Sequence, residues 1–422
     1  MMEKKSQKGS SRGLMSNYKA VVATALLLGS QIPSTAAKVY PSNHESYKFN
    51  YLNNRMRHLK PRSDLSKRDR PISLSVTNSC PDTLWPGIAT QFGDPPESSG
   101  FALGPGKTRK LTVSSDWQGR VWGRTNCTTG DDNATGATAT CLTGDCFGKL
   151  ECNYSGAPPA TLAEFNLAGG ETRKQTFYDI SLVDGYNLPL GIVYHPAPNT
   201  TNFPPNLLNA ACIATAGYLK DPVRTGTFYT NSSFPTPYDD IQTNAGVSKW
   251  CPWDLQAFPP EKPGDGVYPY PDDNVQRPGF DPCKSACAAT NAPSDCCTGK
   301  YDDPSVCKPS LYSGKAKAMC PDAYSYAFDD TTSTFIVPSG GGWEVVFCPE
   351  GRSTNILATF GHQLSAIASG SLSVEEMKAT TMNETFIDEQ PEGSSDSSAA
   401  SAVEGSSVFA CVIAVTAAFL MY

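Results

Sequence analysis

The stretch TFYDISLVDGYNLPL, residues 176–190, joins a strand-like run to a turn signal. The apolar residues of ISLV predict a buried strand, and the pair Asp184-Gly185 is typical of a turn. Asp179 and Asp184 lie five positions apart, so they would point to opposite faces if one strand contained both. The turn frees Asp184 from that alternation. We therefore expect the following loop to bring both carboxylates over one cleft.

Similar strand-like runs occur from Ile72 onward. SLSVTNSC, TRKLTVSS and GRVWGRTNC alternate apolar with polar residues, and Gly, Asn and Asp separate them. TSTFIV and WEVVFC have the same character between residues 332 and 348. Short strands at this spacing favour a mainly β protein, built as a β-sandwich that WEVVFC closes.

The composition changes after about residue 200. Residues 222–282 are rich in Pro, Tyr and Asp, which predicts loops rather than regular structure. Residues 283–320 then carry six cysteines. We therefore expect a disulfide-rich, loop-rich second subdomain at about 200–320. NILATFGHQLSAI, after the last expected strand, predicts one short helix.

The bulk composition is that of a globular protein, with 422 residues, 39% hydrophobic and 18% charged, and a net charge of −7. Nothing in this charge balance indicates nucleic-acid binding. An acidic surface fits a neutral or cationic ligand better than a polyanion. The chain has only four histidines, which disfavours a Ser-His or Cys-His hydrolase.

Fifteen cysteines are present, and fourteen of them lie between Cys80 and Cys348. An even set in one region predicts a disulfide framework formed in an oxidising compartment. A zinc site would need clustered Cys and His ligands. His195 is the only histidine in this region, and the adjacent Cys296 and Cys297 suit two separate bridges better. We expect no metal and no cofactor.

Both ends of the chain carry processing signals. Basic residues before the apolar run VVATALLLG, and small residues after it, predict a signal peptide over 1–37. A basic pro-segment over 38–68 ends in Lys67-Arg68, which would leave Asp69 as the new N-terminus. The alternative is that Lys67 and Arg68 are an exposed charge pair in a loop.

The C-terminal residues favour a lipid anchor. We interpret residues 350–407 as a Ser-rich stalk and the apolar residues 408–422, which include Cys411, as a GPI-signal tail. The anchor would be attached at Ser394, Ser395, Ser397 or Ser398. A tail-anchored helix is the rival interpretation, but the tail is short of the ~20 residues that a membrane span needs.

N-glycosylation sequons agree with secretion. They begin at Asn126, Asn133, Asn153, Asn199, Asn231 and Asn383. The middle residue of the first sequon is a cysteine that we expect to be bridged. The sequence therefore predicts a secreted, GPI-anchored glycoprotein at the cell surface.

Seven blocks of sequence occur in the order found in one protein family. They are WGRTNC at 122–127, CLTGDC at 141–146, PPATLAEFNL at 158–167, YDISLVDGYNLPL at 178–190, CCTG at 296–299, CPDAYSYAFDD at 320–330 and FCP at 347–349. On these blocks the chain from 72 to 349 resembles the thaumatin-like (pathogenesis-related class five) proteins. The resemblance implies a thaumatin-like β-sandwich with a disulfide-rich second subdomain, and we place this domain at 69–349.

The resemblance also implies the cysteine pairing. The implied pairs are Cys80–Cys348, Cys127–Cys141, Cys146–Cys152, Cys212–Cys320, Cys251–Cys283, Cys287–Cys296 and Cys297–Cys307. One further family bridge would need a cysteine shortly before Cys212 and another after TSTF, where Ile336-Val337-Pro338 stands. Both halves are absent together, so the pairing leaves no odd thiol. The stretch 213–282 is longer than in typical plant members and belongs to one wall of the family's cleft.

The same resemblance implies an acidic cleft of one arginine, one glutamate and three aspartates. The matching residues are Arg120, Glu164, Asp179, Asp184 and Asp330, with Asp329 as the adjacent alternative for the last. Carboxylates accept hydrogen bonds from sugar hydroxyls. The resemblance implies β-1,3-glucan as the ligand, with weak endo-β-1,3-glucanase activity in some members.

Hydrolysis would need one protonated and one ionised carboxyl group. We expect Glu164 as general acid and Asp184 as its partner, with Asp179 as second choice and Arg120 keeping one carboxylate ionised. A structural ion-pair network and a calcium site are the alternatives for these groups. Asp322 is expected to cap or hydrogen-bond locally.

Four tyrosines near these acids have two interpretations, because a tyrosine ring can stack on a sugar or pack within the sandwich. They are Tyr178, Tyr186, Tyr324 and Tyr326. We include Tyr186 among the expected substrate-binding residues.

Three functions remain open on the sequence. They are a cell-surface glucan hydrolase, a glucan-binding wall or defence protein without turnover, and an inhibitor or antifungal protein that acts on a protein or membrane target. Because a GPI anchor favours action at the wall, glucan binding, with or without slow cleavage, ranks first. We expect a monomer, attached to the membrane through its anchor, without a nucleic-acid partner.

Overall fold

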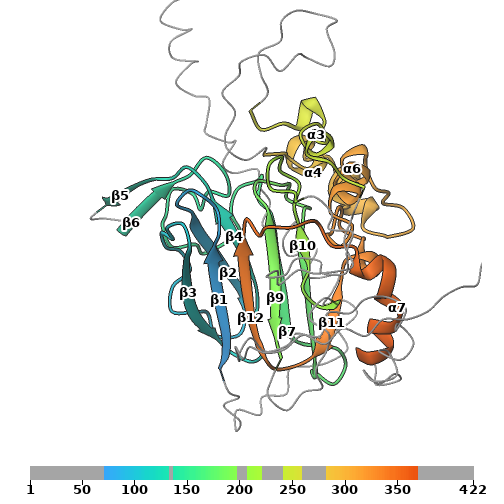
Figure 1. Ribbon diagram of the computed structural model, residues 1–422, viewed down its shortest axis with the longest axis horizontal. Helices are drawn as coiled ribbons and strands as arrows, with labels where there is room; N and C mark the ends of the chain where they lie inside the picture. The colour runs from blue at the N-terminus through green and yellow to red at the C-terminus, as the bar shows by residue number, and fades with distance from the viewer. Residues whose placement is uncertain (1–70, 133–135, 197–206, 221–240, 259–281, 369–422) are drawn as a thin grey trace, which may run out of the picture. The chain divides into compact units, whose positions relative to one another are not determined.

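Two five-stranded sheets face each other in a computed structural model, which describes residues 71–132, 136–196, 207–220, 241–258 and 282–368 (Figure 1). In spatial order, the first sheet contains β10 (Ala211–Cys212), β9 (Leu190–His195), β12 (Gly342–Phe347), β1 (Ile72–Asn78) and β3 (Lys107–Val113). The second contains β11 (Phe335–Pro338), β8 (Gln175–Ser181), β7 (Leu162–Gly169), β4 (Gln118–Arg124) and β2 (Trp85–Phe92). The predicted mainly β sandwich is confirmed.

The strand pairing explains how the sandwich closes. β1 and β12 pair in parallel, and β12 pairs antiparallel with β9 on its other side. The WEVVFC run, which forms β12, therefore lies inside the first sheet between β1, the first strand of the chain, and β9. A separate hairpin, β5 (Thr128–Asp132) with β6 (Gly136–Thr140), lies to one side of the two sheets (Figure 1).

The alternation of side chains in the strands builds the core. In β1, Leu74 and Val76 are buried while Ser73 is exposed, as the period of two requires. Between the sheets, the ring of Trp343 lies 5.3 Å from that of Phe165 and 4.6 Å from that of Tyr178, centroid to centroid. Since β12 carries Trp343 and the second sheet carries the other two rings, these contacts join the two layers.

The second subdomain is made of short helices and loops, as expected. Its elements are α3 (Asn244–Val247), η3 (Trp253–Leu255), α4 (Ala286–Thr290), α5 (Pro293–Cys296), η4 (Gly299–Tyr301), α6 (Leu311–Met319) and η5 (Asp330–Thr332). Helix α6 begins with a capping box, in which the Ser310 and Ser313 side chains each accept from the backbone N–H of the other residue.

Seven disulfides connect these parts, with the same pairing that the resemblance implies. Cys80–Cys348 has a sequence separation of 268 and ties the end of β1 to the end of β12. One cysteine of the family's further bridge would lie at residues 336–338, and in this chain Val337 of β11 is fully buried there. Helix α7 (Ile356–Ala368) packs against that strand and lies beside it in Figure 1.

Helix α7 extends the folded body past the expected boundary at 349. Phe360 and Leu364 of this helix are buried in the main core. Its first N–H groups, those of Ile356 and Leu357, donate to the Asp322 carboxylate at 2.8 Å each. Asp322 therefore caps a helix, but the cap is not local, because its partners lie 34 and 35 residues away. The helix expected around NILATFGHQLSAI is present, packed on the domain rather than standing in a stalk.

Several expectations lie outside the described residues. They are the signal peptide at 1–37, the pro-segment at 38–68, the remainder of the stalk after 368, the GPI-signal tail at 408–422 and the sequons at Asn133, Asn199, Asn231 and Asn383. Within the described ranges, no helix has both the length and the apolar character that a membrane span requires.

The first prediction concerns the longest disulfide loop. Replacing Cys80 and Cys348 with serine is expected to lower the free energy of unfolding by about 5 kcal/mol, because loop-closure entropy grows with loop length. The same change at Cys146 and Cys152, whose separation is 6, is expected to cost about 2 kcal/mol. All four cysteines are buried, so the two pairs are matched. Equal losses in equilibrium denaturant unfolding would contradict this account.

The second prediction concerns the Asp322 cap. Asp322→Ala removes the acceptor for two helix N–H groups, which is expected to cost about 1–3 kcal/mol of stability. Amide hydrogen exchange in α7 should accelerate more than in the core strands. The control is Asp303→Ala, which removes an exposed carboxylate bonded only locally to Ser305 in the described contacts. Unchanged exchange in α7 for Asp322→Ala would refute the capping role.

Candidate functional site

Three of the expected site residues lie directly opposite one another on adjacent strands. In the second sheet, Arg120 of β4 pairs with Glu164 of β7, and Glu164 pairs with Asp179 of β8. Opposite residues in antiparallel strands share a face and lie about 4.5–5.5 Å apart at Cβ. We call these three residues the charged row. The neighbouring Tyr178 and Ile180 belong to the core, so the row lies on the sheet face that points away from the other sheet.

Arg120 and Glu164 form the central ion pair of the charged row. Arg120 Nη2 lies 3.0 Å from Glu164 Oε1, and their side chains are only 6% and 4% exposed. Arg120 Nη1 also donates to Ser155 Oγ at 3.3 Å. Close polar partners lower the cost of burying a charge, and Glu164 and Ser155 are such partners of Arg120. Nothing in the sequence pattern marked Ser155 as a partner of the row.

Asp330 joins the charged row through a tyrosine. Tyr324 lies beside the end of β8, where its backbone N–H donates to Ile180 O at 2.8 Å. Its hydroxyl donates to Asp330 Oδ1 at 2.7 Å. Burial raises the pKa of Tyr324 well above its ordinary value, and the charges of Asp179 and Asp330 raise it further. The Tyr324 hydroxyl is therefore close to both carboxylates.

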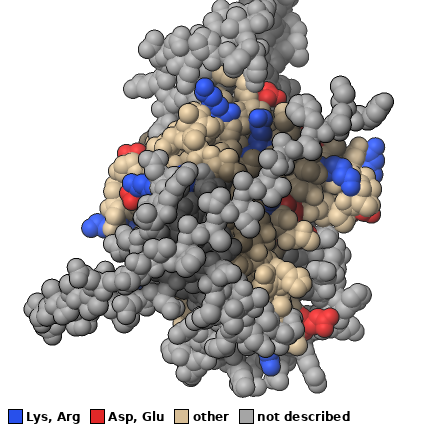
Figure 2. All heavy atoms as spheres, turned by 45° about the vertical axis from the view of Figure 1, so that its right-hand side comes forward, with Lys and Arg blue, Asp and Glu red and all other residues tan. Residues whose placement is uncertain are grey.

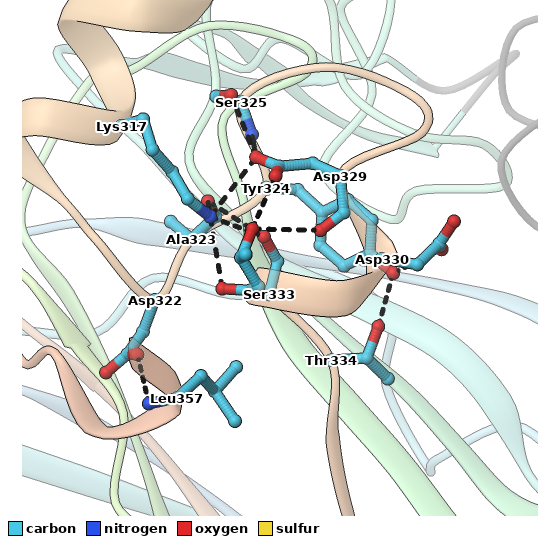
Figure 3. Close-up of polar contacts among 11 residues, drawn as sticks. Lys317, Asp322, Ala323, Tyr324, Ser325, Asp329, Asp330, Ser333, Thr334 and Leu357 are labelled. Carbon is cyan, nitrogen blue, oxygen red and sulfur yellow. Dashed lines mark hydrogen bonds and ion pairs between the residues drawn. The ribbon is translucent and has the colours of Figure 1, made fainter. Parts of the chain in front are cut away.

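Asp329, the alternative to Asp330 for the last aspartate of the expected cleft, has a different role from Asp330. Its Oδ2 lies 3.2 Å from Lys317 Nζ and accepts from Ser325 N at 3.0 Å, while Oδ1 accepts from Thr332 Oγ1 at 2.6 Å. Figure 3 shows Lys317 and Asp329 pointing toward each other. Asp329 thus holds its own loop together, and Asp330 is the aspartate linked to the row.

Lys317, from α6, fixes the loop that carries Tyr324 and Asp330. Its ammonium group donates to Ala323 O at 3.1 Å, Thr332 O at 3.1 Å and Ser333 Oγ at 2.7 Å (Figure 3). Burial lowers the pKa of Lys317, and the Asp329 carboxylate opposes that shift. The Lys317–Asp329 ion pair was not expected from the sequence, because Lys317 lies in α6 and Asp329 in a later loop.

Asp184 lies in a turn beyond β8, as expected. β8 ends at Ser181, Gly185 has φ +99°, and Gly185 N donates to Leu182 O at 3.0 Å. Burial raises the pKa of Tyr312, and the charge of half-buried Asp184 raises it further, which puts this carboxylate near α6. That Asp179 and Asp184 face one cleft stays a prediction.

Of the two interpretations of Tyr186, the structure agrees with packing, because its ring is not exposed for stacking on sugar. Tyr186 is fully buried, its hydroxyl bonds Thr215 Oγ1 at 2.7 Å, and its ring packs 5.8 Å from that of Trp250. Tyr178 and Tyr324 are also fully buried. The Tyr178 ring packs between the two sheets against Trp343, and the Tyr186 ring packs against Trp250 of the second subdomain. In each case the buried hydroxyl has a polar partner.

An exposed aromatic residue lies elsewhere beside the charged row. Tyr154 is 67% exposed and directly precedes Ser155, the partner of Arg120. No sequence signal distinguished Tyr154 from other tyrosines, since its position depends on the fold of residues 146–160.

The described surface charges are of mixed sign on the one face drawn in Figure 2. On the face in Figure 2, acidic and basic side chains are interspersed among neutral residues. Among the described residues, no group of three or more His, Cys, Asp or Glu side chains could hold a metal ion. The side chains of the charged row themselves offer hydrogen bonds and charge, with the carboxylates as acceptors.

Comparison with known proteins agrees with the fold. The Thaumatin family model matches residues 78–349. Thaumatin-like protein 1 of Arabidopsis thaliana is 36% identical over 283 residues, which cover 66% of this chain and 86% of that protein. Pathogenesis-related protein 5 of the same plant is 36% identical over 276 residues, covering 65% and 90%.

Two further similarities are partial. The PR5-like receptor kinase of Arabidopsis thaliana is 34% identical over 285 residues, which cover 67% of this chain but 35% of that protein. The solved structure of the thaumatin-like xylanase inhibitor TLXI is 30% identical, with a TM-score of 0.23 over 28% of this chain and 74% of that one. That superposition is too small to compare sites.

The family assignment indicates a general function. Pathogenesis-related proteins of this class are generally secreted and defence-related, and a framework of seven disulfides suits an oxidising compartment. The family model covers residues 78–349, which contain every strand after β1 and the described part of the second subdomain. This chain belongs to the thaumatin family.

Proposed function

We propose that this protein is a secreted, cell-surface defence protein that binds β-1,3-glucan at the charged row and the neighbouring carboxylates. The observation that carries the proposal is the register of β4, β7 and β8, which sets Arg120, Glu164 and Asp179 side by side. A linear array of one donor group and two carboxylate acceptors suits hydroxyl groups, which both donate and accept hydrogen bonds. The half-buried Asp184 and Asp330 are the acceptors with solvent access.

Binding suits this geometry better than hydrolysis. A general acid must carry a proton and touch the oxygen of the scissile bond. Glu164 is instead 3.0 Å from the Arg120 guanidinium, which favours its ionised form, and its side chain is only 4% exposed. The endo-β-1,3-glucanase activity implied by the resemblance is therefore weak or absent in our proposal.

Attachment to the membrane through a GPI anchor is part of the proposal. The small polar residues before 408 and the apolar run 408–422 support it. An anchored binder would act on glucan in a nearby wall, as a monomer and without nucleic acid.

A second function is favoured by a different observation. Leu142, Phe147 and Tyr154 are 43%, 52% and 67% exposed, and two short disulfides, Cys127–Cys141 and Cys146–Cys152, hold the region that carries them. Exposed apolar side chains on a rigid support are typical of protein-binding surfaces. The alternative is an inhibitor or antifungal protein that acts on a protein or membrane target without catalysis.

The third prediction tests binding. In pull-down on insoluble β-1,3-glucan, Asp184→Asn and Asp330→Asn are each expected to weaken binding roughly tenfold or more, the worth of a hydrogen bond to a charged group. Asp303→Asn, which changes an exposed aspartate of the second subdomain, is the matched control and should bind normally. Binding that survives both Asp184→Asn and Asp330→Asn would refute the glucan site.

The fourth prediction separates binding from cleavage. The secreted protein is expected to release few or no reducing ends from soluble laminarin, and Glu164→Gln should leave that rate unchanged. Since removing one partner of a buried ion pair costs about 3–5 kcal/mol, the variant must first be shown to be folded. Steady hydrolysis that a folded Glu164→Gln variant abolishes would overturn the non-catalytic assignment.

A further inference from the structure

We propose that Asn153 carries an N-linked glycan that stands at the Arg120 end of the charged row. Asn153-Tyr154-Ser155 is a complete sequon. Asn153 is exposed and Tyr154 is 67% exposed, so a glycan there meets no obstacle in the folded protein. The ligand class is thus an oligosaccharide attached covalently to the Asn153 amide nitrogen by glycosyl transfer from an activated, lipid-linked donor, which leaves as the lipid diphosphate.

The disulfides indicate the compartment in which this modification occurs. Each of the fourteen cysteines from Cys80 to Cys348 is bridged, which requires an oxidising environment. N-linked glycans are added to secreted proteins on the same route. The fold thus supports exposure of the Asn153 sequon to that machinery, independently of the N-terminal sequence.

The position of the sequon links it to the candidate site. Ser155 is only 6% exposed, and its Oγ accepts from Arg120 Nη1 at 3.3 Å. Asn153 lies two residues earlier, so its Cα is at most about 7 Å from that of Ser155. Farther along, Ala160 N donates to Asp184 O at 3.4 Å. Residues 153–160 therefore run from the Arg120 end of the site to the Asp184 turn.

The Ser155 hydroxyl has two roles in this proposal. It completes the sequon, and in the folded protein it is the buried partner of Arg120. Because a buried hydroxyl is closed to a transferase, the glycan must be added before the Ser155–Arg120 contact forms. The modification is then retained at the rim of the site.

Asn126 provides a matched comparison. It begins the other sequon within the described residues, Asn126-Cys127-Thr128, and it is also exposed. Its middle residue is bridged to Cys141, and Asn126 itself has the left-handed φ of 48°. The Asn153 sequon has no such constraint at its middle residue, so we assign the glycan to Asn153.

The glycan would restrict access to the site, a consequence that rests on the proposed glucan binding. A hydrated oligosaccharide at Asn153 covers Tyr154 and the Arg120 end of the charged row. A polymer would then approach from the Asp184 and Asp330 side. Loss of the glycan should expose the Tyr154 ring as an additional stacking surface.

The fifth prediction tests the modification. In the full chain secreted from a eukaryotic host, peptide mass spectrometry is expected to find a glycan at Asn153, and enzymatic deglycosylation should convert that residue to aspartate. Asn153→Gln should remove this glycan, Ser155→Thr should keep it, and Asn126→Gln should leave it unchanged. An unmodified Asn153 in the disulfide-bonded, secreted protein would overturn the proposal.

A second measurement tests the position of the glycan. Nitration of Tyr154 should be several-fold slower in the glycosylated protein than in Asn153→Gln, and equal rates would contradict the shielding. Asn153→Gln should also bind insoluble β-1,3-glucan several-fold more tightly than the native protein. If nitration shows shielding but neither protein binds glucan, the glycan site stands and the proposed function fails. If Asn153 carries no glycan but glucan binding depends on Asp330, the proposed function stands and the glycan site fails.

Discussion

The antiparallel register of β4, β7 and β8 is the constraint on which the candidate site depends. It places Arg120, Glu164 and Asp179 opposite one another on one sheet face, where almost no solvent reaches them. A shift by one residue would turn all three side chains toward the core, where burial of the charges would be far more costly. The hydrophobic pattern of the strands and the charges of the row therefore favour the same register.

The second subdomain completes this site through contacts that are distant in sequence. Lys317 holds the loop that brings Asp330 to the Tyr324 hydroxyl, and the Asp322 carboxylate caps α7 behind the same loop. Disulfides within and beside the subdomain limit how far these short helices can move. The sandwich supplies the rigid charged row and the turn that carries Asp184, and the loop held by Lys317 supplies Asp330.

Much of this arrangement could be predicted from the sequence, the fold on physical grounds and the site residues only through the resemblance. Alternating strands and an even cysteine count indicate a disulfide-linked β-sandwich on physical grounds, whereas the pairing and the site residues came from resemblance. The sequence left burial of Tyr186 open, because a tyrosine beside acids looks the same whether it packs or stacks. The remote cap by Asp322 and the Arg120–Ser155 bond join segments 34 to 35 residues apart, which local patterns do not connect. For the same reason α7 was expected to lie near a stalk rather than in the core.

The central claim is that the charged row and its neighbouring acids form a sugar-binding site. A crystal structure of the secreted protein with a β-1,3-linked glucan oligosaccharide tests this claim most directly. The account predicts sugar hydroxyls within hydrogen-bond distance of the Asp184 and Asp330 carboxylates, with the Arg120–Glu164 ion pair intact. An oligosaccharide bound on another face, with these carboxylates facing only water, would contradict it.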